Sequence, residues 1–184
     1  IGALCDGFGK PGDLGGGFCT RAQALFLAAA ALVAVDQIIK VLTRALIPLG
    51  ERITLIPGVV GLTYVQNTGA AFSMLSQHTW LLTIVSAVVP AVIAAALVKK
   101  VVKHPFGVLS LSVVLAGAVG NLIDRLFLGF VTDMFQTLFM RFAVFNVADI
   151  CVVCGGIAFV VYILFFAEKL EKKESGHDTH PADG

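Results

Sequence analysis

The sequence GAVGNLIDRLFLGFVTDMFQTLFMRFAVFNVAD occupies residues 117–149, beginning inside one long apolar run and ending at the start of the next. It contains five ionisable side chains and two asparagines that need an explanation: Asp124, Arg125, Asp133, Arg141, Asp149, Asn121 and Asn146. Ionisable groups within or beside membrane spans are energetically costly and are commonly functional. The stretch therefore predicts a membrane fold with a polar site where two spans meet.

The composition is typical of a membrane protein. Of the 184 residues, 58% are hydrophobic and 14% are charged, and the mean hydropathy is +0.92. A soluble domain is roughly half apolar and about a quarter charged. The excess of apolar residues predicts a polytopic membrane protein of one domain. The net charge of +1 gives no support for nucleic-acid binding.

Four apolar runs are long enough to span a bilayer, since a span needs about 20 residues. They cover roughly residues 22–47, 79–98, 106–128 and 147–167. Between the first two, the sequence ERITLIPGVVGLTYVQN predicts two short strands broken by a Pro-Gly turn, followed by an interfacial helix. The predicted fold class is an all-α membrane protein, with four transmembrane helices, a small extracytoplasmic β-sheet and an interfacial helix.

The distribution of Lys and Arg predicts the orientation of these spans. Six lysines lie in the link between the second and third spans and in the tail, namely Lys99, Lys100, Lys103, Lys169, Lys172 and Lys173. The two opposite links carry Arg52 and Arg141. Both termini are therefore expected to be cytoplasmic, with residues 48–78 and 129–146 outside.

The expected domain organisation has three parts. Residues 1–21 are Gly-rich without a helical period and are expected to form a flexible head. The four-span domain covers 22–167, with its outer β segment at about 48–78. The polar residues 168–184 are expected to form a disordered cytoplasmic tail.

With this orientation, the ionisable residues of the spans form one layer near the outer surface. Asp36 and Lys40 lie four residues apart on one helical face, where they can pair. The others lie at or just beyond the outer ends of the third and fourth spans: Asn121, Asp124, Arg125, Asp133 and Asp149. A proton or ion conduit would place polar groups across the full depth. The single layer instead favours a site open to outside water.

Several members of this layer also have a structural interpretation. Asp36 with Lys40 can be a structural ion pair, and Asp124 with Arg125 a structural clamp. Asn residues can cap helices or bond between them. No basic residue is spaced locally to neutralise both Asp133 and Asp149, so a catalytic pair of carboxylates is an equal hypothesis there.

The small residues have a packing interpretation. Gly117 and Gly120, with Ala116, permit close contact between helices. Cys151 and Cys154 form a C-x-x-C spacing that is known from redox and metal sites. No second pair of ligands accompanies them, so we expect small apolar packing and no metal site.

Five motifs, in order across the four spans, resemble the signal peptidase II (lipoprotein signal peptidase) family. They are DQIIK at 36–40, NTGAAF at 67–72, GAVGNLIDR at 117–125, VTDM at 131–134 and FNVAD at 145–149. The resemblance covers about residues 22–170. It implies a membrane aspartic endopeptidase that cuts diacylglyceryl-modified prolipoproteins before the lipidated cysteine, near the outer face of the bacterial cell membrane and without a cofactor. Its fold would have four transmembrane helices, a small extracytoplasmic sheet and an interfacial helix.

The resemblance also implies roles for individual residues. The catalytic dyad falls on Asp133 and Asp149, and Asp124 would be structural, holding Arg125 or a neighbouring helix. Four residues are candidates to bind substrate or orient the aspartates: Asn67, Asn121, Arg125 and Asn146. Met134 stands where the family usually has Phe, and Ile39 where Ser or Thr is common, which bears on substrate fit.

Two other functions remain as alternatives. A small membrane transporter subunit would need deeper polar residues and an internal repeat. A non-enzymatic lipoprotein-binding scaffold would tolerate Asn at both Asp133 and Asp149.

Overall fold

A computed structural model describes residues 15–69 and 79–167. Its long helices are α2 (Gly15–Leu46), α3 (Thr79–Val98), α4 (Pro105–Leu128) and α5 (Val147–Tyr162), and α5 continues into a π-helical turn, η3 (Ile163–Ala167). Four apolar segments of 19 to 24 residues lie in α2, α3, α4 and α5–η3, and in each at most 28% of an 18-residue window is buried inside the protein. The apolar sides of the helices therefore face outwards, as lipid requires. This confirms the four-span membrane protein.

The ends of α3, α4 and α5–η3 lie within one residue of the expected spans, whereas α2 begins earlier. Residues 15–21, expected in a flexible head, are helical. Extending a formed helix adds one hydrogen bond for each residue that is fixed, so the helix continues beyond the length that the bilayer needs. The rest of the expected head, the interfacial helix and the tail lie outside the described residues.

Three antiparallel strands form a sheet in the order β1-β2-β3. β1 (Arg52–Ile56) and β2 (Val60–Asn67) are the two expected strands, joined by a turn in which Gly58 has a φ of 73°. β3 (Val131–Thr137) lies in the link expected between the last two spans and was not predicted. Asn67 pairs with Val131 and Val65 with Asp133. Asn67 and Asp133 are therefore diagonal neighbours on one face of the sheet.

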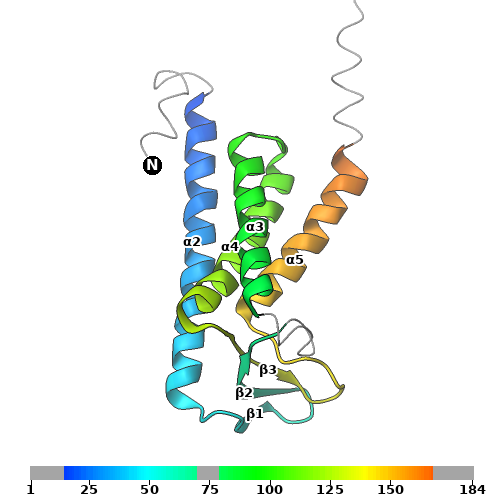
Figure 1. Cartoon of the computed structure of the whole chain (residues 1–184). Coiled ribbons are helices and arrows are strands. Elements are labelled where there is room, and N and C mark those ends of the chain that lie inside the picture. Colours follow the sequence, from blue (N-terminus) through cyan, green and yellow to red (C-terminus); the bar gives the residue numbers. More distant parts are fainter. Residues whose placement is uncertain (1–14, 70–78, 168–184) are drawn as a thin grey trace, which may run out of the picture.

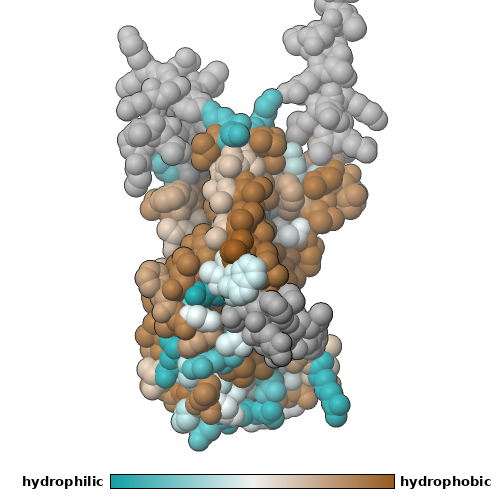
Figure 2. Space-filling model, viewed as in Figure 1, coloured by the Kyte–Doolittle hydropathy of each residue, from teal (hydrophilic) through white to brown (hydrophobic). Residues whose placement is uncertain are grey.

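The sheet lies at one end of the helix bundle, and the start of α2 and the end of η3 lie at the other (Figure 1). α4 is the central helix, packing against α2, α3 and α5. Figure 2 shows apolar side chains over the sides of the helices and polar ones gathered towards the two ends. The exposed Lys99 and Lys100 follow α3 at the end away from the sheet.

Close contact between α4 and α5 depends on glycine. A Cβ on Gly117 would clash with the backbone oxygen of Ala148, and one on Gly155 would lie 2.9 Å from the backbone nitrogen of Val114. The predicted close helix contact through small residues is thus confirmed. Because the two helices approach so closely, the C-terminal part of α4 meets the first turn of α5.

Two local signals direct the chain through the site. α4 ends at Gly129, whose φ of 79° is the left-handed conformation that favours glycine. α5 begins with a capping box, in which Asn146 and Asp149 each bond the backbone of the other. β3 lies between the end of α4 and the start of α5. These two local signals therefore also help to position Asp133 on β3.

Candidate active site

Two carboxylates lie on separate elements and are joined by one residue. Asp133 is on β3 and only 2% exposed, and Asp149 is in the first turn of α5 and half-buried. The side-chain amide of Asn146 donates to Asp133 Oδ1 at 2.6 Å, and its backbone N–H donates to Asp149 Oδ2 at 3.1 Å. Both acids are therefore within reach of the same asparagine.

Two further asparagines hold the remaining carboxyl oxygens. Asn67 Nδ2 donates to Asp133 Oδ2 at 2.9 Å, and Asn121 Nδ2 donates to Asp149 Oδ1 at 2.8 Å. Asn146 Nδ2 also donates to Asn121 Oδ1 at 3.2 Å. Every oxygen of the two carboxyls thus accepts a hydrogen bond from an amide N–H. These bonds orient a carboxyl without neutralising it.

The environment of Asp133 favours its protonated form. Burial raises its pKa to about 6, against the lowering effect of the Asn67 hydrogen bond. The charge of Asp149 contributes to this rise in pKa, whereas the Asn146 hydrogen bond and Lys40 act against it. An acid with this pKa can exchange a proton at near-neutral pH.

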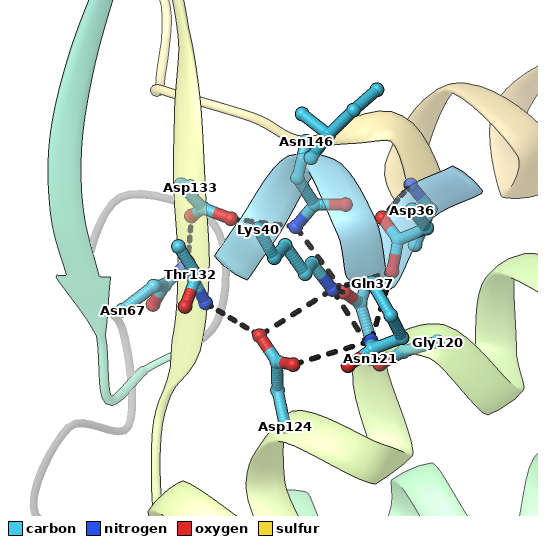
Figure 3. Close-up of polar contacts among 12 residues, drawn as sticks. Asp36, Gln37, Lys40, Asn67, Gly120, Asn121, Asp124, Thr132, Asp133 and Asn146 are labelled. Atoms are coloured by element: carbon cyan, nitrogen blue, oxygen red, sulfur yellow. Dashed lines mark hydrogen bonds and ion pairs between the residues drawn. The ribbon is translucent and has the colours of Figure 1, made fainter. Parts of the chain in front are cut away.

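A buried ion network lies near Asp133 and includes Asn121, which bonds Asp149 (Figure 3). Lys40 is fully buried, and its Nζ lies 2.9 Å from Asp36 Oδ2 and 3.5 Å from Asp124 Oδ2. The predicted pairing of Asp36 with Lys40 is thus confirmed. Lys40 also donates to Asn121 Oδ1 at 2.9 Å. Because the amide of Asn121 holds Asp149, the ion network supports the carboxyl pair.

Asp124 contacts helix α2 and strand β3. Its carboxylate accepts from Gln37 Nε2 at 3.3 Å, and from the backbone N–H of Thr132 at 2.8 Å. Thr132 immediately precedes Asp133, so this bond fixes the strand beside the acid. Within the part of the chain that the structure describes, no hydrogen bond or ion pair joins Asp124 to Arg125. The direct contacts of Asp124 therefore join α4 to α2 and β3. Its interaction with Arg125 is electrostatic only.

Asp36 does more than pair with Lys40. Its Oδ1 accepts from the backbone N–H of Ala148 at 2.9 Å, in the first turn of α5. Free N–H groups at a helix start favour such an anion. A Cβ on Gly120 would lie 2.6 Å from Asp36 Oδ2, so glycine makes room for the carboxylate. Asp36 thereby fixes the end of α5 that carries Asp149.

Arg125 differs from the other candidates. It is half-buried and interacts electrostatically with Asp149, Asp133 and Asp124. Among the described residues, its side chain has neither a hydrogen-bond nor an ion-pair partner. A guanidinium beside two carboxyls without a direct partner is available to bind a ligand.

Three residues of this cluster were not predicted from the sequence: Gln37, Arg44 and Thr132. Arg44 Nη1 donates to Thr132 Oγ1 at 2.8 Å. The four-residue spacing of Asp36, Lys40 and Arg44 puts all three on one helical face, and this signal could have identified Arg44. Thr132 donates its backbone N–H to Asp124. A sequence pattern cannot predict that contact, because almost every residue has a backbone N–H.

A cavity of about 760 Å³ opens beside Asp133. It lies between the ends of β2 and β3 and the segment 138–144, and Asn67 also lines it. No group of three or more His, Cys, Asp or Glu residues in the ranges 15–69 and 79–167 is placed to hold a metal ion. Buried Cys151 and exposed Cys154 are both free thiols. The arrangement provides two amide-held acids, of which Asp133 lines the cavity, and such a pair can transfer protons to and from a bound reactant.

Comparisons with known proteins agree on one family. The family model described as signal peptidase (SPase) II matches residues 28–165. The lipoprotein signal peptidase of Enterococcus faecalis is 42% identical over 151 residues, covering 82% of this chain and 94% of the relative. That of Streptococcus pneumoniae is 41% identical over 133 residues, covering 72% and 87%.

Two solved structures that resemble this chain are described as bacterial membrane enzymes. One, determined at 2.3 Å resolution, is 26% identical with a TM-score of 0.72, covering 88% of this chain and 95% of the other. A second, at 1.9 Å, is 27% identical with a TM-score of 0.71, covering 78% and 94%.

Proposed function

Because this chain belongs to the signal peptidase II family and removes signal peptides from lipoproteins as an aspartic peptidase, we propose that Asp133 and Asp149 are its catalytic dyad. The observation that carries this proposal is the bridge by Asn146, whose side chain and backbone hold one carboxyl each. Two carboxyls that share a site cannot both ionise easily, so the pair retains one proton. The proton belongs to the pair, and neither residue is assigned as permanent acid or base.

The proposed reaction is the hydrolysis of one peptide bond. The ionised carboxylate takes a proton from a water, whose oxygen attacks the scissile carbonyl carbon, and the protonated carboxyl donates to the carbonyl oxygen. The pair then donates a proton to the leaving nitrogen as the C–N bond breaks. It recovers one proton from the hydroxyl that becomes the new carboxyl group, and the dyad returns to its starting state.

The asparagines and Arg125 have different proposed roles, which are to orient the carboxyls and to bind the substrate. Asn67, Asn121 and Asn146 orient the two carboxyls through the bonds described above. Arg125, which has no direct partner among the described side chains, binds a backbone carbonyl of the substrate. Hydrogen-bond donors that are already in position before the reaction need no reorganisation during it.

We further propose the orientation and the substrate detail. The termini and the lysine-bearing link lie in the cytoplasm and the sheet lies outside, since positive residues favour the cytoplasmic side. The start of α2, the end of η3 and Lys99 with Lys100 lie at the end of the bundle away from the sheet, which supports this orientation. The substrate is a diacylglyceryl-modified prolipoprotein in the bacterial cell membrane, cut before the lipidated cysteine, and its acyl chains stay in contact with membrane lipid.

Cleavage of a lipidated prolipoprotein by the purified protein in detergent tests the proposal. We expect Asp133→Asn and Asp149→Asn each to lower the rate by about 10²- to 10⁴-fold, with no fall in the thermal unfolding temperature. Glu51→Gln is the matched control, because Glu51 is an exposed carboxylate outside the site. The same substrate without its lipid should not be cut. Substantial activity in either aspartate variant would refute the dyad.

A further inference from the structure

The cavity beside Asp133 lies entirely outside the membrane spans. All its lining residues belong to the sheet, to Thr68 or to the segment 138–144, and none belongs to α2, α3, α4 or α5. It reaches the proposed dyad through Asp133 and Asn67. The cavity therefore leads from the site away from the lipid-facing part of the protein.

Two arginines give this cavity a positive charge. Arg52 on β1 and Arg141 in the segment after β3 both line it, and both side chains are exposed. Neither forms an ion pair with a carboxylate of the described residues. Asp133 is the only acidic residue among the described residues that line the cavity. Its carboxyl is proposed to share one proton with Asp149. The charge of the walls is thus uncompensated and complementary to an anion.

A buried acceptor also lines the cavity. Gln136, on β3, has a side-chain oxygen that is buried and has no hydrogen-bond partner among the described residues. A buried acceptor without a partner is energetically unfavourable. A backbone N–H of a peptide lying along β3 would satisfy it. Within the described part of the chain, the cavity therefore contains an unpaired hydrogen-bond acceptor, Gln136 Oε1, as well as the two arginines.

The path of the substrate determines which peptide segment can lie there. The signal peptide is apolar and approaches from the bilayer, and the acyl chains on the cysteine must remain in lipid. The residues that follow the cysteine must leave towards water, on the side of the sheet. The cavity volume of about 760 Å³ is within the usual range for ligand sites and suits a few residues of this segment.

We propose that this cavity binds the residues immediately after the lipidated cysteine, and that Arg52 and Arg141 make it prefer aspartate or glutamate there. The inference rests on the proposed function, since it needs the scissile bond to lie at the dyad. The preference acts on substrate choice and not on the chemical step. Because both arginines are exposed, salt should weaken the preference.

A competition experiment tests this subsite. Two lipidated prolipoproteins, identical except for Asp-Asp or Asn-Asn after the cysteine, are mixed with the enzyme in neutral detergent, and the ratio of their kcat/KM values is measured. Both substrates compete for the same enzyme molecules, so the ratio is independent of the folded fraction. We expect the wild type to prefer the acidic substrate about three- to tenfold, and the Arg52→Gln/Arg141→Gln double variant to bring the ratio close to one.

Charge reversal and a remote cation sharpen the test. Arg52→Glu/Arg141→Glu should reverse the order, favouring a Lys-Lys substrate, whereas Lys99→Gln, a cation at the far end of the bundle, should keep the wild-type ratio. If the wild type cuts both substrates equally, or the double variant keeps the preference, the subsite is refuted while the peptidase stands. If neither substrate is cut, the proposed function itself fails.

A membrane phosphate is the competing occupant of the cavity. If the double variant loses activity equally towards both substrates, and only when vesicles contain phosphatidylglycerol, the arginines bind lipid and the peptide subsite is refuted.

Discussion

Two pairs of carboxylates lie on either side of Asn121, and their partners differ in charge. Asp36 and Asp124 both lie within 3.5 Å of the ammonium of Lys40. Asp133 and Asp149 accept hydrogen bonds from amide groups, and no cation within residues 15–69 and 79–167 forms an ion pair with either. Asn121 connects the pairs, because it accepts from Lys40 and donates to Asp149.

The difference separates structure from chemistry. Asp36 and Asp124 face a buried ammonium, and the attraction between opposite charges offsets part of the cost of burying them. A buried carboxyl held by neutral amides is oriented but not neutralised, so burial raises the pKa of Asp133 to about 6. The first pair is suited to holding helices together, and the second to exchanging protons.

Removing the cation should cause the largest loss of stability. Lys40→Met leaves Asp36 and Asp124 buried without their partner, and breaking a buried pair in this way costs about 3–5 kcal/mol. Thermal unfolding in detergent measures the loss. Adding Asp36→Asn to Lys40→Met should recover part of it, because one of the uncompensated charges is removed. An unchanged unfolding temperature in Lys40→Met would contradict the structural role given to this pair.

Changing the amide bridge should affect the reaction more than the fold. Asn146→Ser keeps a side-chain oxygen that can cap α5, but it is too short to donate to Asp133 and Asn121. We expect a rate loss of about ten- to a thousandfold, and a smaller loss of stability than in Lys40→Met, because no buried charge loses an ion-pair partner. Asn146→Ala should also lose the cap, about 1 kcal/mol more. Full activity in Asn146→Ser would mean that the carboxyls need no shared donor.

The second pair should also give the protein a characteristic pH dependence. The pKa of Asp133 is raised to about 6 in the folded state, against about 4 in the unfolded chain. Its contribution to stability is therefore full below pH 4 and is lost as the pH rises through 6, by up to about 3 kcal/mol. Asp133→Asn should flatten this part of the unfolding profile. Equal pH profiles for the wild type and this variant would contradict the raised pKa.

The features that could be predicted from the sequence are those with a local pattern. Apolar runs gave the spans, and the four-residue spacing gave the Asp36–Lys40 pair. β3 could not be predicted in the same way, because its main partner is β2, more than 60 residues earlier, and because apolar residues surround it. The bonds from Asp36 to Ala148 and from Asp124 to Thr132 use backbone N–H groups, which every residue except proline carries.

The smallest predicted effect concerns the contact that joins α2 to the strand of Asp133. Arg44 donates to the hydroxyl of Thr132. The backbone N–H of Thr132 donates separately to Asp124. Arg44→Gln and Thr132→Val should therefore each cost only about 1 kcal/mol, and the double variant should cost little more than either, because one bond is lost in all three. The unfolding temperatures of the three variants measure this cycle. Additive losses would mean that each side chain acts through another partner, and that the buried ion network alone connects α2 to the strand of Asp133.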